Sequence, residues 1–297
     1  KVIDPDLEIG DFMNYELEFE NMGRNAATIL HSNFEYRLQR FIEENIVSKY
    51  KDKIGKIVSG TVTRIDKQEN TFIEIGEVKG ILQRKSRIKG EVFKVGDVVK
   101  AVVKGVNIDK INGLLIDISR TSPKFLENLL ALEVPELKDK KVIIEASARI
   151  PGSRSKIALS TSEPQIDPIG SVVGVKGVRI GSVSKQLHGE NIDCVEFSTI
   201  PEMFISRALS PALVNSVKIE KHPSYGEKGK AIVTIPSDQK SKAIGKAGLN
   251  IRLASMLTKY DIELVEVASL SSSTTTNEKN IAEDKTTDTA SLEALFK

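Results

Sequence analysis

The spacing of apolar side chains changes along the chain, and each spacing predicts a different kind of element. Residues 7–20 alternate between apolar and polar in the manner of a strand, whereas residues 24–46 place an apolar side chain at every third or fourth position. The second spacing predicts one amphipathic helix of about six turns. Its apolar side is expected to pack on the strand, and its polar side to remain available to a partner. The main apolar positions are Ala27, Leu30, Phe34, Leu38, Phe41, Ile42 and Ile46.

Between residues 54 and 120 the apolar positions form short segments rich in Val and Ile. They are separated by Gly, Asn, Asp and Lys, and they read IVSGTVTRI, TFIEIG, GILQ, VVKAVVKGVNI and GLLIDISR. Five short strands of this kind predict a small antiparallel barrel, for which the OB-fold is the commonest nucleic-acid-binding form. Phe72 and Phe93 are candidate platforms on which bases could stack. The alternative is that each ring packs in the core. The candidate phosphate contacts of the barrel are Arg64, Arg84, Lys85 and Arg87.

From residue 123 the pattern becomes helix, strand, strand, helix, helix, strand, and the same order then repeats. The first copy begins with PKFLENLLALEVPEL and ends with the strand IDCVEF, and the second begins with PEMFISRAL and ends with IELVEV. Pro201 and Ser237 are well placed to begin helices of the second copy. Because the whole module is duplicated, chance does not explain the similarity of its parts.

Each copy carries the pattern G-x-x-G-x-x-I between its last two helices, at residues 174–180 and 245–251. Glycine has no Cβ, so it adopts left-handed backbone angles and lets another molecule's backbone approach. Ile180 and Ile251 are expected on the buried side of the helix that follows. A loop of this type clamps single-stranded nucleic acid in KH modules. One such pattern alone indicates a simple turn, whereas two with the same flanks favour the clamp.

The clamp interpretation assigns RNA contacts to both loops and to the start of the helix after each. The expected contacts are Gly174, Val175, Lys176, Gly177 and Arg179 in the first module, and Gly245, Lys246, Ala247, Gly248, Asn250 and Arg252 in the second.

These patterns predict an α+β multidomain protein. An α/β N-terminal head is expected at residues 1–50, and a five-stranded OB-type β-barrel at residues 51–122. Two tandem KH domains are expected at residues 123–198 and 199–268. Residues 269–297 are polar and of low complexity, with too few apolar side chains to offset the entropy of ordering, so a disordered tail is predicted.

The formal net charge of +2 is unevenly distributed. Residues 1–50 contain 5 basic and 10 acidic side chains, residues 51–120 contain 15 and 9, and residues 171–269 contain 13 and 10. An acidic head avoids phosphates and is expected to face a protein, whereas a polyanion would bind the basic middle. Charge alone is equally compatible with an ordinary solvated surface.

The remaining composition argues against several classes of protein. The single cysteine, Cys194, rules out an internal disulfide framework and fits a reducing cytoplasm. The three histidines lie far apart, so we expect no metal site, and no cofactor is expected. No apolar run approaches about 20 residues and no signal peptide is visible, which predicts a cytoplasmic protein without membrane insertion. A first residue of Lys1 predicts a fragment or a processed chain.

Several longer motifs resemble the NusA family of bacterial transcription termination and antitermination factors. The motifs are EVPEL at 133–137, ARIPGSRSKIAL at 148–159, DPIGSVVGVKGVRI at 167–180, LHGENIDCVEF at 187–197 and AIGKAGLNIRLASMLT at 243–258. The resemblance covers residues 24–267. It departs from the family at Lys176, where an arginine is usual, and this change keeps the charge but loses bidentate geometry.

The resemblance implies an RNA-binding elongation factor that rides on RNA polymerase and modulates pausing, intrinsic termination and antitermination. It implies that the acidic head docks on DNA-directed RNA polymerase near the RNA exit channel. The barrel, of the ribosomal protein S-one type, would form one continuous surface for single-stranded nascent RNA with the two KH modules. Other Nus-type elongation factors are further candidate partners, and a monomer is expected. The expected polymerase contacts are Glu35, Arg37, Gln39 and Arg40.

Two further departures concern the ends of the resemblance. The head lacks the helical start of the family, so part of the polymerase-binding domain is expected to be missing. No acidic repeat module follows the second KH module.

Two other functions are compatible with KH and OB modules. One is the RNA-holding part of a phosphorolytic exoribonuclease, but no region is left for a catalytic core, and Glu133 and Glu136 have no convergent partner in the sequence. The other is a ribosome-assembly KH protein, which would not need the acidic head. The leading expectation is therefore a protein that binds RNA and is not an enzyme.

Overall fold

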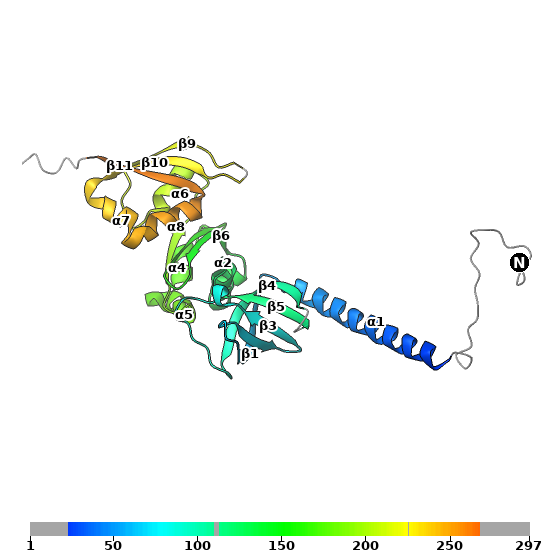
Figure 1. Ribbon diagram of the computed structural model, residues 1–297. Coiled ribbons are helices and arrows are strands. Elements are labelled where there is room, and N and C mark those ends of the chain that lie inside the picture. The colour runs from blue at the N-terminus through cyan, green and yellow to red at the C-terminus, as the bar shows by residue number, and fades with distance from the viewer. Residues whose placement is uncertain (1–22, 110–112, 225, 268–297) are drawn as a thin grey trace, which may run out of the picture.

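The computed structural model describes residues 23–109, 113–224 and 226–267 (Figure 1). One long helix leads into a closed barrel, and two modules of mixed helix and strand follow. This arrangement confirms the predicted α+β class. The strand predicted at residues 7–20 and the tail predicted at residues 269–297 lie outside the described residues.

Helix α1 (Arg24–Lys51) projects from the barrel, and most of its surface faces solvent (Figure 1). The predicted burial of its apolar stripe is wrong for the described residues, because Phe34 is 65% exposed and Phe41 is 62% exposed. The strand expected to cover them lies outside those residues. At its C-terminal end the helix reaches the barrel core: Tyr50 is buried, and its hydroxyl donates to the carbonyl of Ile75 at 3.2 Å.

The barrel closes in the strand order β1-β2-β3-β5-β4. Its strands are β1 (Ile57–Ile65), β2 (Thr71–Ile75), β3 (Val78–Leu82), β4 (Val98–Asp109) and β5 (Gly113–Ser119). The predicted five strands are confirmed, but β3 and β5 are parallel, so the barrel is not antiparallel throughout. The exception arises because the chain crosses the barrel after the short helix η2 (Arg84–Ser86), and β4 then pairs with β1.

The first α/β module has the predicted order of helix, strand, strand, helix, helix, strand. Its elements are α2 (Pro123–Glu133), α3 (Pro135–Lys138), β6 (Val142–Ile150), β7 (Arg154–Thr161), α4 (Pro168–Val173), η3 (Val175–Gly177), α5 (Val178–Gln186) and β8 (Asn191–Glu196). Strand β6 is antiparallel to β7, and β8 is parallel to β7. Helix α2 begins with a proline behind Ser122, whose hydroxyl accepts from the backbone N–H of Lys124.

The second module repeats this construction. Its elements are α6 (Pro201–Ala208), β9 (Ser216–Lys221), β10 (Gly229–Pro236), η4 (Ser237–Gln239), α7 (Lys240–Ile244), η5 (Lys246–Gly248), α8 (Leu249–Thr258) and β11 (Tyr260–Val267). Strand β10 is antiparallel to β9 and parallel to β11. Pro201 begins α6 as predicted, whereas Ser237 begins only the single 3-10 turn that precedes α7.

The barrel and the first module are joined by a shared hydrophobic cluster and by two linked, buried ion pairs. Arg120 Nη2 lies 2.6 Å from Glu91 Oε1, and Arg149 Nε lies 2.8 Å from Glu190 Oε1. The pairs are connected because Arg149 also donates to the carbonyl of Arg120 at 2.7 Å. Arg120 in turn donates to the carbonyl of Gln186, at the end of α5, at 2.8 Å. The barrel is therefore fixed against the helix that follows the first loop.

The second module packs on the sheet of the first, with α8 lying against β6 and β7. Ala148 and Ala158 provide small side chains in the hydrophobic cluster at this seam. Lys156 is fully buried there, donates to the carbonyl of Ser210 at 2.8 Å, and lies 3.6 Å from Asp193. Burial lowers the pKa of the Lys156 ammonium. The two modules thus form one packed body, which holds their two loops at a fixed separation (Figure 1).

Candidate nucleic-acid interface

Both modules place a four-residue loop between their last two helices, and the two loops have the same backbone shape. The values of φ at the first, third and fourth positions are 74°, 53° and 73° in residues 174–177. They are 72°, 52° and 71° in residues 245–248. Glycine adopts this left-handed region freely, whereas Lys176 and Ala247 are held in it at the third position. The predicted repeat of the loop therefore extends to its conformation.

The first glycine of each loop is required by packing. A Cβ built on Gly174 would lie 2.8 Å from Cγ of Arg179, and a Cβ on Gly245 would lie 2.7 Å from Cβ of Asn250. Real Cβ atoms do not approach other atoms so closely, so any other residue would displace the helix start behind the loop.

The second glycine of each loop faces open space. A Cβ on Gly177 would meet its nearest atom, Cγ2 of Ile180, at 3.9 Å, and a Cβ on Gly248 would have nothing within 4 Å. A strand of nucleic acid has room to approach on this side. Ile180 and Ile251 are partly buried, in keeping with the expectation for the helices that follow.

Two of the predicted RNA contacts, Arg179 and Asn250, form hydrogen bonds within the protein around the loops. Arg179 Nη1 lies 3.0 Å from Glu136 Oε2 and donates to the carbonyl of Ser171 at 2.6 Å. Asn250 is 3% exposed, and its Nδ2 donates to three backbone carbonyls at 3.0 to 3.1 Å. Direct RNA contact by the Asn250 side chain is therefore wrong, because the amide is buried and serves the backbone around the loop. An RNA contact by the partly exposed Arg179 stays a prediction.

The remaining predicted contacts of the loops are open to solvent. Lys176, Lys246 and Arg252 are exposed, and they take part in none of the ion pairs formed within the described ranges. Val175 is 83% exposed and Val178, the first residue of α5, is 70% exposed. Both loops therefore present free cations, and the first loop adds uncovered apolar surface; a phosphate backbone with splayed bases requires both features.

Neither predicted stacking platform of the barrel is exposed in this structure. Phe72 is 8% exposed, and the guanidinium of Arg64 lies over its ring at 4.2 Å from the centroid. The ring lines a surface hollow with Arg64, whose guanidinium occupies the face a base would use, so stacking of a base on Phe72 requires Arg64 to move aside and stays a prediction. Phe93 is partly buried and packs against the barrel core. Arg64 itself remains exposed and lines a hollow of about 410 Å³.

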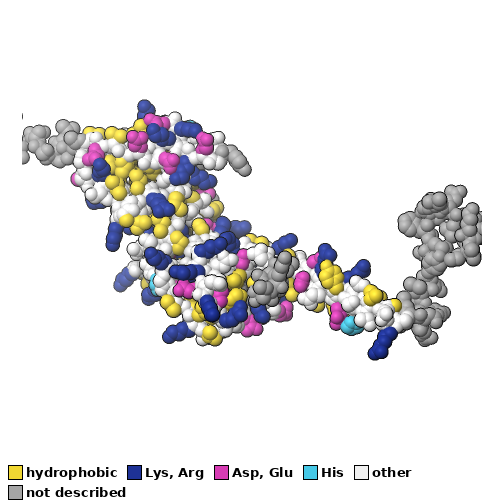
Figure 2. All heavy atoms as spheres, viewed as in Figure 1, with side chains coloured by type: hydrophobic (Ala, Val, Ile, Leu, Met, Phe, Trp, Pro, Cys, Tyr) yellow, Lys and Arg dark blue, Asp and Glu magenta, His cyan; other side chains and the backbone are white. Residues whose placement is uncertain are grey.

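The other predicted cations of the barrel line a second hollow of about 410 Å³, beside η2. Arg84 and Lys85 are exposed there, and Arg87 is partly buried. Both arginines pair with Glu69, a residue that sequence reasoning missed because it lies 18 positions before Arg87. Figure 2 shows Lys and Arg side chains spread over the barrel and both modules.

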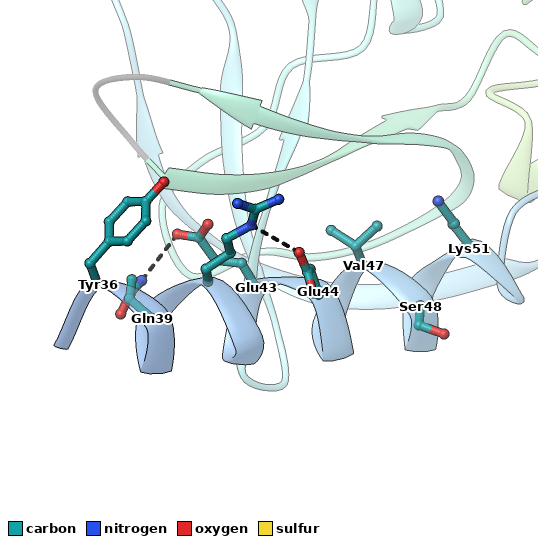
Figure 3. A pocket seen from close by; sticks show the side chains of 8 residues that line it. Tyr36, Gln39, Glu43, Glu44, Val47, Ser48 and Lys51 are labelled. Carbon is teal, nitrogen blue, oxygen red and sulfur yellow. Dashed lines mark hydrogen bonds and ion pairs between the residues drawn. The ribbon is translucent and has the colours of Figure 1, made fainter. Parts of the chain in front are cut away.

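Two of the four predicted polymerase contacts of α1 line a hollow, and two do not. Gln39 and Arg40 line a hollow of about 620 Å³. The described residues that line it all belong to α1, which runs beside the β4–β5 hairpin (Figure 3). There Arg40 Nε lies 3.0 Å from Glu44 Oε1. Glu35 and Arg37 are exposed and do not line this hollow, and Glu35 lies 3.6 Å from His31.

The described ranges contain no cluster of three or more side chains suited to bind a metal ion. None of the helices in these ranges combines the length and the apolar character needed to cross a membrane.

The fold and its loops define a protein with two tandem KH modules beside an OB-type barrel. Residues 120–197 match the NusA-like first KH domain, and residues 201–272 match the NusA-like second KH domain. The transcription termination/antitermination protein NusA of Helicobacter pylori (strain ATCC 700392 / 26695) is 43% identical over 317 residues, covering 100% of this chain and 79% of the relative. The chain belongs to the NusA family of transcription termination/antitermination proteins.

Two more distant relatives carry the same name. The protein of Thermus thermophilus is 40% identical over 263 residues, which cover 89% of this chain and 66% of the relative. The protein of Bacillus subtilis (strain 168) is 34% identical over 262 residues, which cover 88% of this chain and 69% of the relative. The resemblance stated from the motifs is confirmed.

Proposed function

We propose that this protein is a bacterial transcription termination and antitermination factor that holds single-stranded nascent RNA on its two KH loops. The observation that carries the proposal is the pair of loops with one backbone shape, each open at its second glycine and flanked by exposed cations. Membership of the NusA family supports the role in transcription. The proposal includes contact between the N-terminal region and RNA polymerase, with other Nus-type factors as further partners.

The loops hold RNA by shape and charge. The second glycine lets the RNA backbone approach, and Lys176, Lys246 and Arg252 bind its phosphates. Unstacked bases then lie over the apolar surface at Val175 and Val178. A strand held in this way is restrained while it emerges from the polymerase, and this restraint is how the factor modulates pausing and termination.

The carboxylates near the first loop support a binding role over a catalytic one. Glu133 accepts hydrogen bonds from Ser182 and Gln186, and Glu136 pairs with Arg179. The pKa of Glu136 is lowered, first by a backbone hydrogen bond and then by Arg179 against the effect of desolvation. We propose that the chain acts by binding alone, without a cofactor, as a cytoplasmic monomer.

Salt dependence tests the RNA proposal directly. The chain is expected to bind an unstructured RNA, with log K falling by about 0.7 per phosphate neutralised for each unit of log salt. A contact with about four phosphates predicts an affinity loss of about 50-fold between about 50 and about 200 mM salt. Removing residues 1–45, while keeping Ile46 and Tyr50 in the barrel core, should leave this response unchanged. A flat salt response, or equal affinity for duplex RNA, would contradict the proposal.

Charge reversal on α1 tests the polymerase proposal. Arg37→Glu with Arg40→Glu should weaken co-purification with core RNA polymerase, because both cations are exposed on the helix. RNA affinity should stay within about twofold of the parent, since the residues lie outside the loops. The matched control is Lys49→Glu, which reverses one charge on the same helix near the barrel. Loss of RNA affinity with intact polymerase binding would overturn the assignment.

A further inference from the structure

A carboxylate occupies the point on the barrel where two candidate RNA-binding arginines converge. Oε2 of Glu69 lies 2.9 Å from Nη2 of Arg87 and 3.3 Å from Nε of Arg84. A single oxygen therefore receives two guanidinium groups, an arrangement that also suits an oxygen of a phosphate. Arg84 and Glu69 are well exposed, so this pair is open to competition by an anion from solution.

The turn that carries Glu69 is built to hold it in place. Oδ1 of Asp66 accepts from the backbone N–H groups of Gln68 at 2.9 Å and Asn70 at 2.7 Å. Oδ1 of Asn70 in turn accepts from the backbone N–H of Arg84 at 3.2 Å, which ties the turn to η2. Glu69 itself has a φ of 62°, in the left-handed region that is strained for a residue with a Cβ. The turn thus fixes Glu69 against the arginines.

The hollow beside Glu69 and its two arginines is strongly basic, because one of its carboxylates is already neutralised by an arginine outside the hollow. Glu91 lines it but is committed to Arg120, and Oε2 of Glu91 also accepts from the backbone N–H of Ile88 at 3.1 Å. Glu69 is the other carboxylate that lines the hollow in the described residues. The cations that line it are Arg84, Lys85, Arg87 and Lys89.

The hollow lies on the route from the first KH loop to the barrel. Gly90, at its rim, approaches His188 of the first module: a Cβ there would lie 3.4 Å from Nε2 of the ring. Helix α5 runs from the loop to this junction and spans about 14 Å. A strand held at Gly177 therefore needs only a few nucleotides to reach the hollow.

We propose that Glu69 is a displaceable stand-in for an RNA phosphate, which keeps Arg84 and Arg87 aligned and lowers the RNA affinity of the barrel until a strand replaces it. This inference rests on the proposed RNA-binding function and adds its regulation at the barrel. An RNA phosphate that enters the hollow takes over both guanidinium groups and releases Glu69 to solvent. The barrel then contributes only to strands that reach it from the first loop.

The test compares two substitutions that each remove one negative charge at opposite ends of β2. Glu69→Gln should raise affinity for an unstructured RNA about three- to tenfold and steepen the salt response by about 0.7 in log–log slope. Glu77→Gln, at the exposed pair with Lys49, should change affinity less than twofold. Adding Arg87→Gln to Glu69→Gln should abolish the gain. Urea unfolding of each variant verifies that the barrel is intact.

Each result of these binding measurements supports or contradicts the stand-in role of Glu69. Equal affinities for the Glu69→Gln and Glu77→Gln proteins, or a gain that survives Arg87→Gln, would overturn the stand-in role while leaving the proposed function intact, provided that the parent binds RNA with the expected salt response. A parent that does not bind single-stranded RNA would overturn both.

Discussion

Replacing Gly177 and Gly248 together with Asp is expected to lower the affinity for single-stranded RNA at least about 100-fold, or about 2.8 kcal/mol. Each Asp would place a negative charge on the open side of its loop, where the RNA backbone is proposed to approach. The fold should survive, because a Cβ at either position meets nothing closer than 3.9 Å. The left-handed backbone costs about 1 kcal/mol per site, and Asp tolerates it better than most residues.

The matched control is Asn at the same two positions, because Asn has nearly the same shape, tolerates left-handed angles and carries no charge. Filter binding or fluorescence anisotropy should show the double-Asn protein well above the double-Asp protein in affinity. Lys176→Ala with Lys246→Ala should cause a smaller loss and a shallower salt slope. If double-Asp and double-Asn bind equally well, electrostatic contact at the loops is absent and the clamp interpretation fails.

Replacing Glu190 with Gln is expected to lower the free energy of unfolding by about 3 to 5 kcal/mol. Glu190 is fully buried, and besides Arg149 it accepts from the N–H of Gly152 and the hydroxyl of Ser155. The variant would leave the guanidinium of Arg149 buried without its counter-charge. Urea unfolding monitored by circular dichroism measures the loss.

An exposed pair on the second module provides the control for this prediction. Glu263→Gln disrupts an ion pair with Lys230 at 3.4 Å, and it should cost less than about 1 kcal/mol. Combining Arg149→Met with Glu190→Gln should recover much of the loss, since no unpaired charge then remains buried. A Glu190→Gln protein as stable as the Glu263→Gln protein would show that the buried pair does not stabilise the fold.

Local patterns in the sequence predicted the elements well because periodicity and turn residues act over short distances. The duplicated order of helices and strands and the two glycine loops follow from such patterns. The parallel pairing of β3 with β5 could not be predicted this way, because it depends on how the chain crosses the end of the barrel. The exposure of Phe34 on α1 was also beyond periodicity, which identifies an apolar stripe but not what covers it.

The sequence predicted which residues lie at the candidate site more reliably than it predicted what each of them does there. Asn250 and Arg179 occupy the same position after their first glycines, so the sequence assigned both to RNA. The direction of a side chain depends on partners far away in the chain, and Arg179 is paired with a residue 43 positions earlier. Phe72 was ambiguous for the same reason, since Arg64 on the neighbouring strand decides whether the ring is free.

The seam between α8 and the sheet of the first module has a consequence for the length of RNA that can be bound. Because the modules are packed together, a strand caught by one loop meets the other in an intramolecular step, with an effective concentration set by the linking nucleotides. A linker too short to span the gap gives no second contact, and a long one dilutes it. If RNA binds as proposed, its affinity therefore depends on the length of its unpaired segment, and an RNA that folds on itself between the loops loses one of its two attachments.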